Sequence, residues 1–239
     1  MIEHHLLLAL DTATRHPTLA LAETDGDVVG ESQWESQHRH GEELLQRLDD
    51  LLAHAAAKPR DLAGVIVGIG PGSFTGLRIG LATAKTIAYS LDVPIVGIST
   101  TQALALAAFD GESGRTEFAV TLPAGAKDRY VHRVVVDGES VKEEGSPQLV
   151  VPGAAFDEAC TDALVVAIDL DAADDISDED AERGETALRG LARALASLGT
   201  QALKSGKHDD IERLVPAYVA LPRGIAQAVA EMTWSPDLR

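Results

Sequence analysis

The fold of this chain is constrained most by short, uninterrupted apolar runs that alternate with helical patterns. The run LLLAL at residues 6–10 ends at Asp11, and VIVGI at residues 65–69 ends at Gly70. Runs this short without polar alternation are typical of strands buried on both faces. Between them, leucines recur at helical spacing after Gly41, which predicts an amphipathic helix ending near Pro59. The alternation predicts an α/β fold.

The same patterns predict a first half of order βββαβαβα and a second half that repeats it crudely. In the first half we expect strands at residues 6–10, 18–23, 28–32, 65–69 and 95–98, and helices at 41–57, 77–91 and 103–109. In the second half we expect strands at 118–122, 130–136 and 163–168, and helices at 154–160 and 185–198. The linker-like stretch 110–114 then predicts two domains, 1–110 and 111–239, with a C-terminal tail that could pack back on the first.

The charge balance excludes some function classes. Lys and Arg total 20 against 38 Asp and Glu, a formal net charge of −18. Such a chain repels phosphate backbones, which argues against a stand-alone nucleic-acid binder. Cys160 is the one cysteine, so no disulfide can form within the chain. No apolar stretch approaches the ~18 residues of a membrane helix, and we expect a cytoplasmic protein without membrane contact.

One acidic segment stands out in the second half. Between Asp169 and Glu185 there are nine acids and one base, Arg183. A metal site is one interpretation, but runs of like charge are usually solvated. We therefore interpret the segment as a solvated loop or long linker.

Asp11, Thr12 and Thr14 form the first candidate site. An Asp at a strand end, followed by hydroxyls in a tight turn, can meet phosphate oxygens and hold a hydrated Mg²⁺. This pattern indicates possible nucleotide binding. Because Asp and Thr are also common turn residues, a purely structural turn stays open.

A glycine-rich stretch at residues 68–80 is the second candidate. Its loop residues are Gly70, Gly72, Ser73, Thr75 and Gly76. The hydroxyls can cap the following helix, whose N-terminus attracts anions. No Gly-Lys-Ser/Thr closes the loop, so it is not a Walker A motif. A structural strand-to-helix turn is the alternative.

No arrangement of nucleophiles or metal ligands supports independent catalysis. The pairs His4–His5 and His38–His40 lack the i, i+4 spacing of a helical metal site. No Gly-x-Ser-x-Gly motif occurs, and Cys160 has no local catalytic signature. We predict neither catalytic residues nor a metal site.

Four segments in order resemble the bacterial TsaB (YeaZ) family. They are LALDTAT at 8–14, HGEELL at 40–45, GPGSFTGLRIG at 70–80 with Ala84-Lys85, and VGIS at 96–99. The resemblance is strong over the first ~110 residues, and an ordered multipart match is more specific than one motif. Later landmarks are DRYV at 128–131 and PAYV at 216–219.

The resemblance implies an actin/Hsp70/sugar-kinase (ASKHA) fold made of two βββαβα-type subdomains. It implies a non-catalytic subunit that binds and activates TsaD, the catalytic paralogue, in making threonylcarbamoyladenosine on tRNA. It also implies contact with the ATPase TsaE, and with tRNA only through the complex. ATP or ADP with Mg²⁺ would belong to the complex, with no cofactor on this chain alone.

Two alternatives remain open at this stage. A stand-alone small-molecule kinase or ATPase of the same fold would use Asp11 and Thr12 at the phosphates. A homodimer without a TsaD partner is the other. Two departures from the family pattern also stand out: an acid is missing near Pro123, and an Arg is missing near Ala220.

The first two long helices carry the predicted partner interface. Apolar and small residues there exceed what one sheet contact needs, and small residues four apart let another helix approach closely. The predicted interface residues are Gly41, Leu45, Leu52, Gly80, Thr83, Ala84 and Ile87. The alternative is that second-half helices cover this surface.

Overall fold

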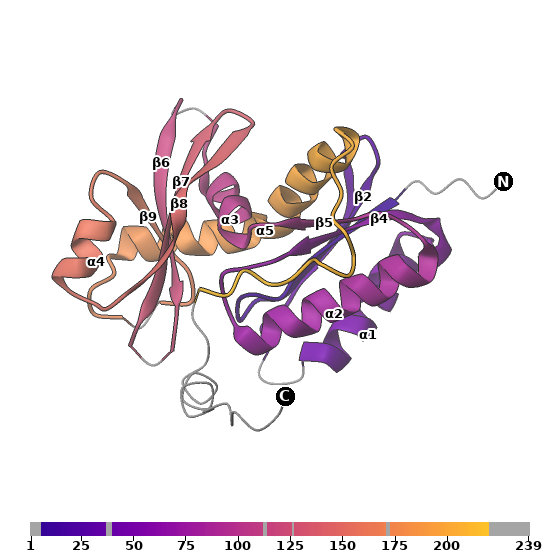
Figure 1. Ribbon diagram of the computed structural model, residues 1–239, viewed down its shortest axis with the longest axis horizontal. Coiled ribbons are helices and arrows are strands. Elements are labelled where there is room, and N and C mark those ends of the chain that lie inside the picture. The colour runs from indigo at the N-terminus through magenta and orange to yellow at the C-terminus, as the bar shows by residue number, and fades with distance from the viewer. Residues whose placement is uncertain (1–5, 37–39, 112–113, 126, 171–172, 220–239) are drawn as a thin grey trace, which may run out of the picture.

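The computed structural model describes residues 6–36, 40–111, 114–125, 127–170 and 173–219. Two sheets stand side by side, with helices packed on and between them (Figure 1). No described helix is both long enough and apolar enough to cross a bilayer.

The first sheet has the strand order β3-β2-β1-β4-β5. An antiparallel meander opens it: β1 (Leu6–Asp11), β2 (Thr18–Glu23) and β3 (Val28–Gln33). The turn between β2 and β3 contains Gly26 with φ 116°, a conformation that glycine adopts without strain. After the short 3₁₀ helix Pro59–Asp61, β4 (Leu62–Gly68) pairs parallel to β1, and β5 (Ile95–Ile98) pairs parallel to β4.

Helices cover both faces of this sheet. One face packs Leu8, Leu10 and Val65 against α1 (His40–His54) and α2 (Phe74–Leu91). The other face packs Leu7 and Ala9 against α3 (Thr100–Ala108) and α5 (Asp178–Lys204). Alternate strand residues point to opposite faces, so the continuous apolar run of β1 follows from burial on both sides.

The second sheet has the order β8-β7-β6-β9. It consists of β6 (Thr116–Pro123), β7 (Arg129–Asp137), β8 (Ser140–Val150) and, after α4 (Ala154–Ala159), the parallel strand β9 (Leu164–Ala167). Both halves therefore contain three antiparallel strands, a helix, a parallel strand and a helix. This topology confirms the predicted α/β fold of the actin/Hsp70/sugar-kinase type.

Helix α5 links the halves. It packs against β9 and against all five strands of the first sheet, and Figure 1 shows it running across both. One apolar cluster contains Ala9 and Val96 of the first sheet, Val120 and Val166 of the second, and Leu191 of α5. The predicted boundary at 110–114 lies on the connection between α3 and β6 and stays a prediction, because the core is continuous across it.

The structure corrects three element predictions. Strand β8 was not predicted, because its polar sequence is largely exposed and has no regular alternation. Helix α2 begins at Phe74 rather than Leu77, with Ser73 Oγ accepting a 3.1 Å hydrogen bond from Gly76 N.

Helix α5 begins at Asp178 rather than Glu185, so the acidic segment is only partly a loop. Ser177 Oγ accepts a 3.2 Å hydrogen bond from Asp180 N, and three acids occupy the first turn, where the helix dipole favours them.

The chain after α5 returns to the first sheet and covers the edge strand β5. Asp209 N donates to Ile95 O at 2.8 Å, and Gly97 N donates to the Asp209 carboxylate at 2.8 Å. Ala217 N donates to Ile69 O at 2.8 Å. This segment, residues 209–218, is called the tail segment below.

Candidate functional site

Asp11, at the end of β1, is 1% exposed and fully engaged inside the protein. Its Oδ1 accepts a 2.7 Å hydrogen bond from Ala13 N, and its Oδ2 accepts a 2.6 Å hydrogen bond from Thr100 Oγ1. Burial raises the pKa of Asp11 from 3.8 to about 6, against the lowering effect of the Thr100 bond. The carboxylate therefore anchors the start of α3 instead of facing a ligand.

Thr12 is buried against the glycine-rich segment. Its hydroxyl donates a 2.7 Å hydrogen bond to Gly76 O. A Cβ at Gly76 would lie 2.0 Å from Thr12 O, and one at Gly80 would lie 2.2 Å from Thr12 Oγ1. A Cβ at Gly72 would lie 2.4 Å from Ala13 O. These glycines are required because α2 and the turn after β1 are in direct contact.

The amides of the glycine-rich loop are also used within the protein. Ser73 N donates to Ala13 O at 2.7 Å, Gly70 N donates to Thr100 Oγ1 at 3.0 Å, and Gly76 N donates to Ser73 Oγ. Thr75 is exposed in the first turn of α2. These three bonds hold the loop as a strand-to-helix turn.

A cleft of about 520 Å³ lies between the halves, next to this turn. Thr14, Gly72 and Ser73 line it from the first half, and Leu122 and Pro123 line it from the second. Thr14 is 4% exposed, and its hydroxyl bonds His16 N at 3.1 Å and His16 O at 3.2 Å. The predicted site residues are thus brought together, but Asp11 and Thr12 lie beneath the wall of the cleft.

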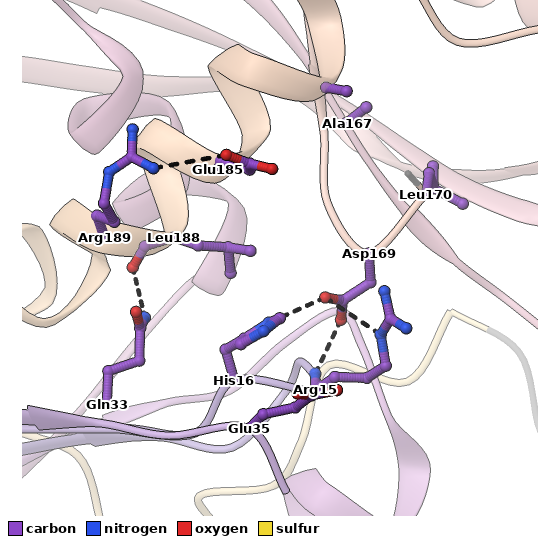
Figure 2. Close-up of a pocket in the computed structure, with 11 residues that line it drawn as sticks. Arg15, His16, Gln33, Glu35, Ala167, Asp169, Leu170, Glu185, Leu188 and Arg189 are labelled. Carbon is purple, nitrogen blue, oxygen red and sulfur yellow. Dashed lines mark hydrogen bonds and ion pairs between the residues drawn. The ribbon is translucent and has the colours of Figure 1, made fainter. Parts of the chain in front are cut away.

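Asp169 closes one side of the cleft and was missed by the sequence analysis. Its side chain is 4% exposed and accepts a 2.8 Å hydrogen bond from Arg15 N. Figure 2 shows His16 and Arg15 converging on this carboxylate, at 3.1 Å and 3.4 Å. The available signal was its position directly after the buried strand β9, as Asp11 ends β1. Its φ of 56° marks a sharp turn there.

Comparison with known proteins gives one consistent result. A family model described as TsaD, tRNA N6-adenosine threonylcarbamoyltransferase, matches residues 30–168, more than half of the chain. The Bacillus subtilis protein named tRNA threonylcarbamoyladenosine biosynthesis protein TsaB is 37% identical over 99 residues, 41% of this chain and 43% of that protein. The Escherichia coli protein of the same name is 32% identical over 124 residues, 52% of each. The chain belongs to the TsaB (YeaZ) family.

The extent of these matches differs between sequence and structure. The chain spans about half the length of the curated TsaB relatives it matches. The solved structure of YeaZ from Pseudomonas aeruginosa is 24% identical, with a TM-score of 0.67 over 90% of this chain and all of that chain. The shared fold therefore extends well beyond the region of strong sequence similarity.

Three predicted interface residues of this TsaB-family chain are inside the protein. Leu52 is 3% exposed in the core beneath α1, and Ala84 is fully buried against the first sheet. Gly80 faces Thr12. These residues face into the protein, which helical spacing could not show because it defines stripes on α1 and α2 but not which stripe meets the sheet.

The remaining interface candidates lie toward the surface. Leu45 is 54% exposed, and Thr83 and Ile87 are half-buried. A Cβ at Gly41 would lie 3.9 Å from Ile79, where α1 meets α2. Tyr89, which the sequence analysis did not single out, is 80% exposed.

Of the two departures from the family pattern, only the one near Pro123 falls within the described residues. Pro123 ends β6 and lines the cleft, and no acid is present there to reach a phosphate. Ala220 lies outside the described residues. Among the residues that the structure describes, no group of three or more His, Cys, Asp or Glu side chains is placed to hold a metal ion.

Proposed function

We propose that this chain is a non-catalytic subunit that binds and activates a TsaD-type threonylcarbamoyltransferase in tRNA threonylcarbamoyladenosine modification. The observation that carries the proposal is that the side chains of Asp11 and Thr12 are buried and hydrogen-bonded inside a TsaB-family chain. Both are 1% exposed and bonded internally. A chain that keeps the fold but withdraws its strand-end acid from the cleft is suited to a partner's role. Contact with a TsaE-type ATPase and with tRNA would then come through the complex.

The kinase or ATPase alternative has less support. Phosphoryl transfer needs positioned groups that stabilise charge on the transferring phosphate. Asp11 and Thr12, which were expected to do so, do not reach the cleft. The amides of Gly70, Ser73 and Gly76 donate within the protein. We expect the purified chain not to hydrolyse ATP.

The docking surface we propose is the outer side of α1 and α2. It is defined by Leu45, Ile79, Thr83, Ile87 and Tyr89, and is called the α1–α2 face below. Leu45 and Tyr89 are the large exposed apolar side chains of these two helices, and Ile79, Thr83 and Ile87 are half-buried. Exposed apolar surface is typical of interaction sites.

The two helices of this face differ in charge. Helix α2 contains Arg78 and Lys85 and no acid, although the whole chain has a net charge of −18. Helix α1 contains Glu42, Glu43, Asp49 and Asp50 against Arg47. A complementary partner surface would therefore be acidic opposite α2 and basic opposite α1.

The proposal is tested by co-elution of the purified chain with the TsaD-type protein of the same cell. Leu45→Glu and Tyr89→Glu should each abolish or strongly weaken co-elution without changing thermal unfolding. Leu149→Glu is the matched control, because Leu149 is 49% exposed on β8 in the second half. Undiminished co-elution of both Leu45→Glu and Tyr89→Glu would show that the docking surface is not the α1–α2 face. Failure of the unmodified chain to co-elute would refute the proposed function.

RNA binding provides a second test. With a net charge of −18, the isolated chain should show no appreciable tRNA affinity in filter binding at physiological salt. Submicromolar binding by the chain alone would contradict a role that reaches tRNA only through the complex.

A further inference from the structure

Two arginines on β7, Arg129 and Arg133, are bonded very differently. Arg133 uses Nε and Nη2 on Glu117, and Nη1 on the carbonyls of Ala159 and Thr161 at 3.2 and 2.8 Å. The donors of Arg133 that point into the protein therefore have acceptors. Arg133 therefore serves as the comparison for the hydrogen bonding of Arg129.

Arg129 is 4% exposed and lacks part of this bonding. Its Nη2 pairs with Asp175, and its guanidinium carbon lies 4.7 Å from the centre of the Phe156 ring. Its Nη1 is buried and has no hydrogen-bond partner in the described part of the chain. Because a buried charged donor without an acceptor is costly, an oxygen placed at Nη1 would be strongly favoured.

Arg129 lies in the wall of a cavity of about 840 Å³ at one end of the second sheet. The cavity is bounded by the β6–β7 hairpin, the turn before α4 and the segment after β9. Gly125 and Gly153 lie in its wall with φ of 125° and 103°, and a Cβ on either would meet nothing within 4 Å. The cavity is large enough for a small organic molecule and is open at these loops.

The charges around the cavity disfavour a multiply charged anion. The cations are Arg15, Lys127 and Arg129, and the carboxylates are Asp128, Asp169, Asp174 and Asp175. Asp169 is paired with Arg15 and His16, and Asp175 with Arg129. With four carboxylates among the described residues of the wall, a dianion would be repelled more than a monoanion.

We propose that this cavity binds a small molecule through a single oxyanion, a carboxylate, which accepts from Arg129 Nη1 with Lys127 at the rim. The site is separate from the α1–α2 face and does not depend on the proposed subunit role. The carboxylate supplies Arg129 Nη1 with the acceptor that the carbonyls of Ala159 and Thr161 supply to Arg133 Nη1.

The test is an NMR titration of the full chain with sodium acetate and with sodium phosphate, each against sodium chloride at constant ionic strength. Acetate should cause saturable shifts of the Gly125 and Gly153 amides, and phosphate should bind several-fold more weakly. Arg129→Lys, which keeps the charge but removes the guanidinium arms, should raise the acetate dissociation constant about tenfold. Arg133→Lys is the matched control and should leave it unchanged.

Lys127→Gln keeps the proposal testable if Arg129→Lys fails to fold. Lys127 is exposed in the hairpin, so its substitution should leave folding intact and weaken acetate binding several-fold. Acetate-induced shifts that do not saturate, or that sodium chloride reproduces, would overturn the proposal. Tighter binding of phosphate than of acetate would overturn the assignment to a carboxylate.

Discussion

Asp169 accepts a 2.8 Å hydrogen bond from the backbone N–H of Arg15, across 154 positions of the chain. The same carboxylate lies 3.1 Å from His16 Nδ1 (Figure 2). Because Arg15 and His16 follow β1 and Asp169 follows β9, this contact ties the two halves together beside the cleft. Much of the relative position of the halves at that point depends on one buried side chain.

Asp169→Asn should destabilise the protein by about 1–3 kcal/mol, because the Arg15 N–H and the His16 ring lose the charged group of a side chain that is only 4% exposed. Asn tolerates the positive φ of 56° at this position, so the loss reports on charge and hydrogen bonding. The measurement is urea unfolding followed by circular dichroism. Asp174→Asn, an exposed neighbour in the acidic segment, should change stability by less than about 0.5 kcal/mol. Equal effects at both positions would mean that the whole segment is simply solvated.

Gly80→Ala should cost about 1–3 kcal/mol by overpacking, because the new Cβ would lie 2.2 Å from Thr12 Oγ1. Removing that hydroxyl in Thr12→Ala/Gly80→Ala should relieve part of the cost, giving a double mutant more stable than the sum of the single effects predicts. Thermal unfolding of the unmodified chain, the two single variants Thr12→Ala and Gly80→Ala, and the double variant measures this coupling. Additive effects would show that α2 does not meet Thr12 at Gly80.

Gly80→Arg should therefore unfold the chain rather than selectively block a partner. Ala82→Arg is the control on the same helix, because Ala82 is exposed and its substitution should leave the melting temperature nearly unchanged. A folded Gly80→Arg protein would restore Gly80 as an interface residue.

The pH dependence of stability should carry the signature of Asp11. Its pKa is raised from 3.8 to about 6 on folding, so the folded state binds the proton more tightly. The contribution of Asp11 is thus most favourable below pH 3.8 and is lost as the pH rises to about 6, by about 3 kcal/mol in all.

Asp11→Asn removes that titration, so the stability of the variant relative to the unmodified chain should rise between pH 4 and 7. Chemical unfolding at several pH values measures the difference, in which effects of other titrating groups largely cancel. A constant difference across this range would show that Asp11 titrates normally.

We expect Tyr218 to hold the tail segment against α2. Its ring lies 5.1 Å from that of Phe74, and its hydroxyl accepts a 3.1 Å hydrogen bond from Arg78 Nε. Tyr218→Ala should lower the hydrogen-exchange protection of the Ala217 amide about tenfold, because the ring contact and the hydrogen bond are both lost.

Tyr218→Phe separates the two contributions, since it keeps the ring contact and should retain most of the protection. Val215→Ala, at a residue 64% exposed in the same segment, should have little effect. Unchanged hydrogen-exchange protection of the Ala217 amide in Tyr218→Ala would mean that the tail segment is held by its backbone bond to β5 and by buried Leu214.

Much of the local structure could be predicted because its signals lie between neighbouring residues. The apolar run of β1 reports burial on both faces, and the leucine spacing of α1 reports one buried side. Strand β8 escaped prediction because an exposed strand has no burial pattern to reveal it. The early start of α5 escaped because a run of acids in a first helical turn resembles a solvated loop.

The candidate site divides in the same way. The sequence by itself determined two of the segments that meet at the cleft, since the strand end at Asp11 and the glycine-rich turn are visible as motifs, and it was sufficient to recognise the family. Only the tertiary structure decided that Asp11 points inward to Thr100, that Gly80 faces Thr12, and that Asp169 holds Arg15. These contacts join residues 68 to 154 positions apart. Their partners are set by how helices and halves pack, and periodicity along the chain carries no record of which face or which distant residue that packing selects.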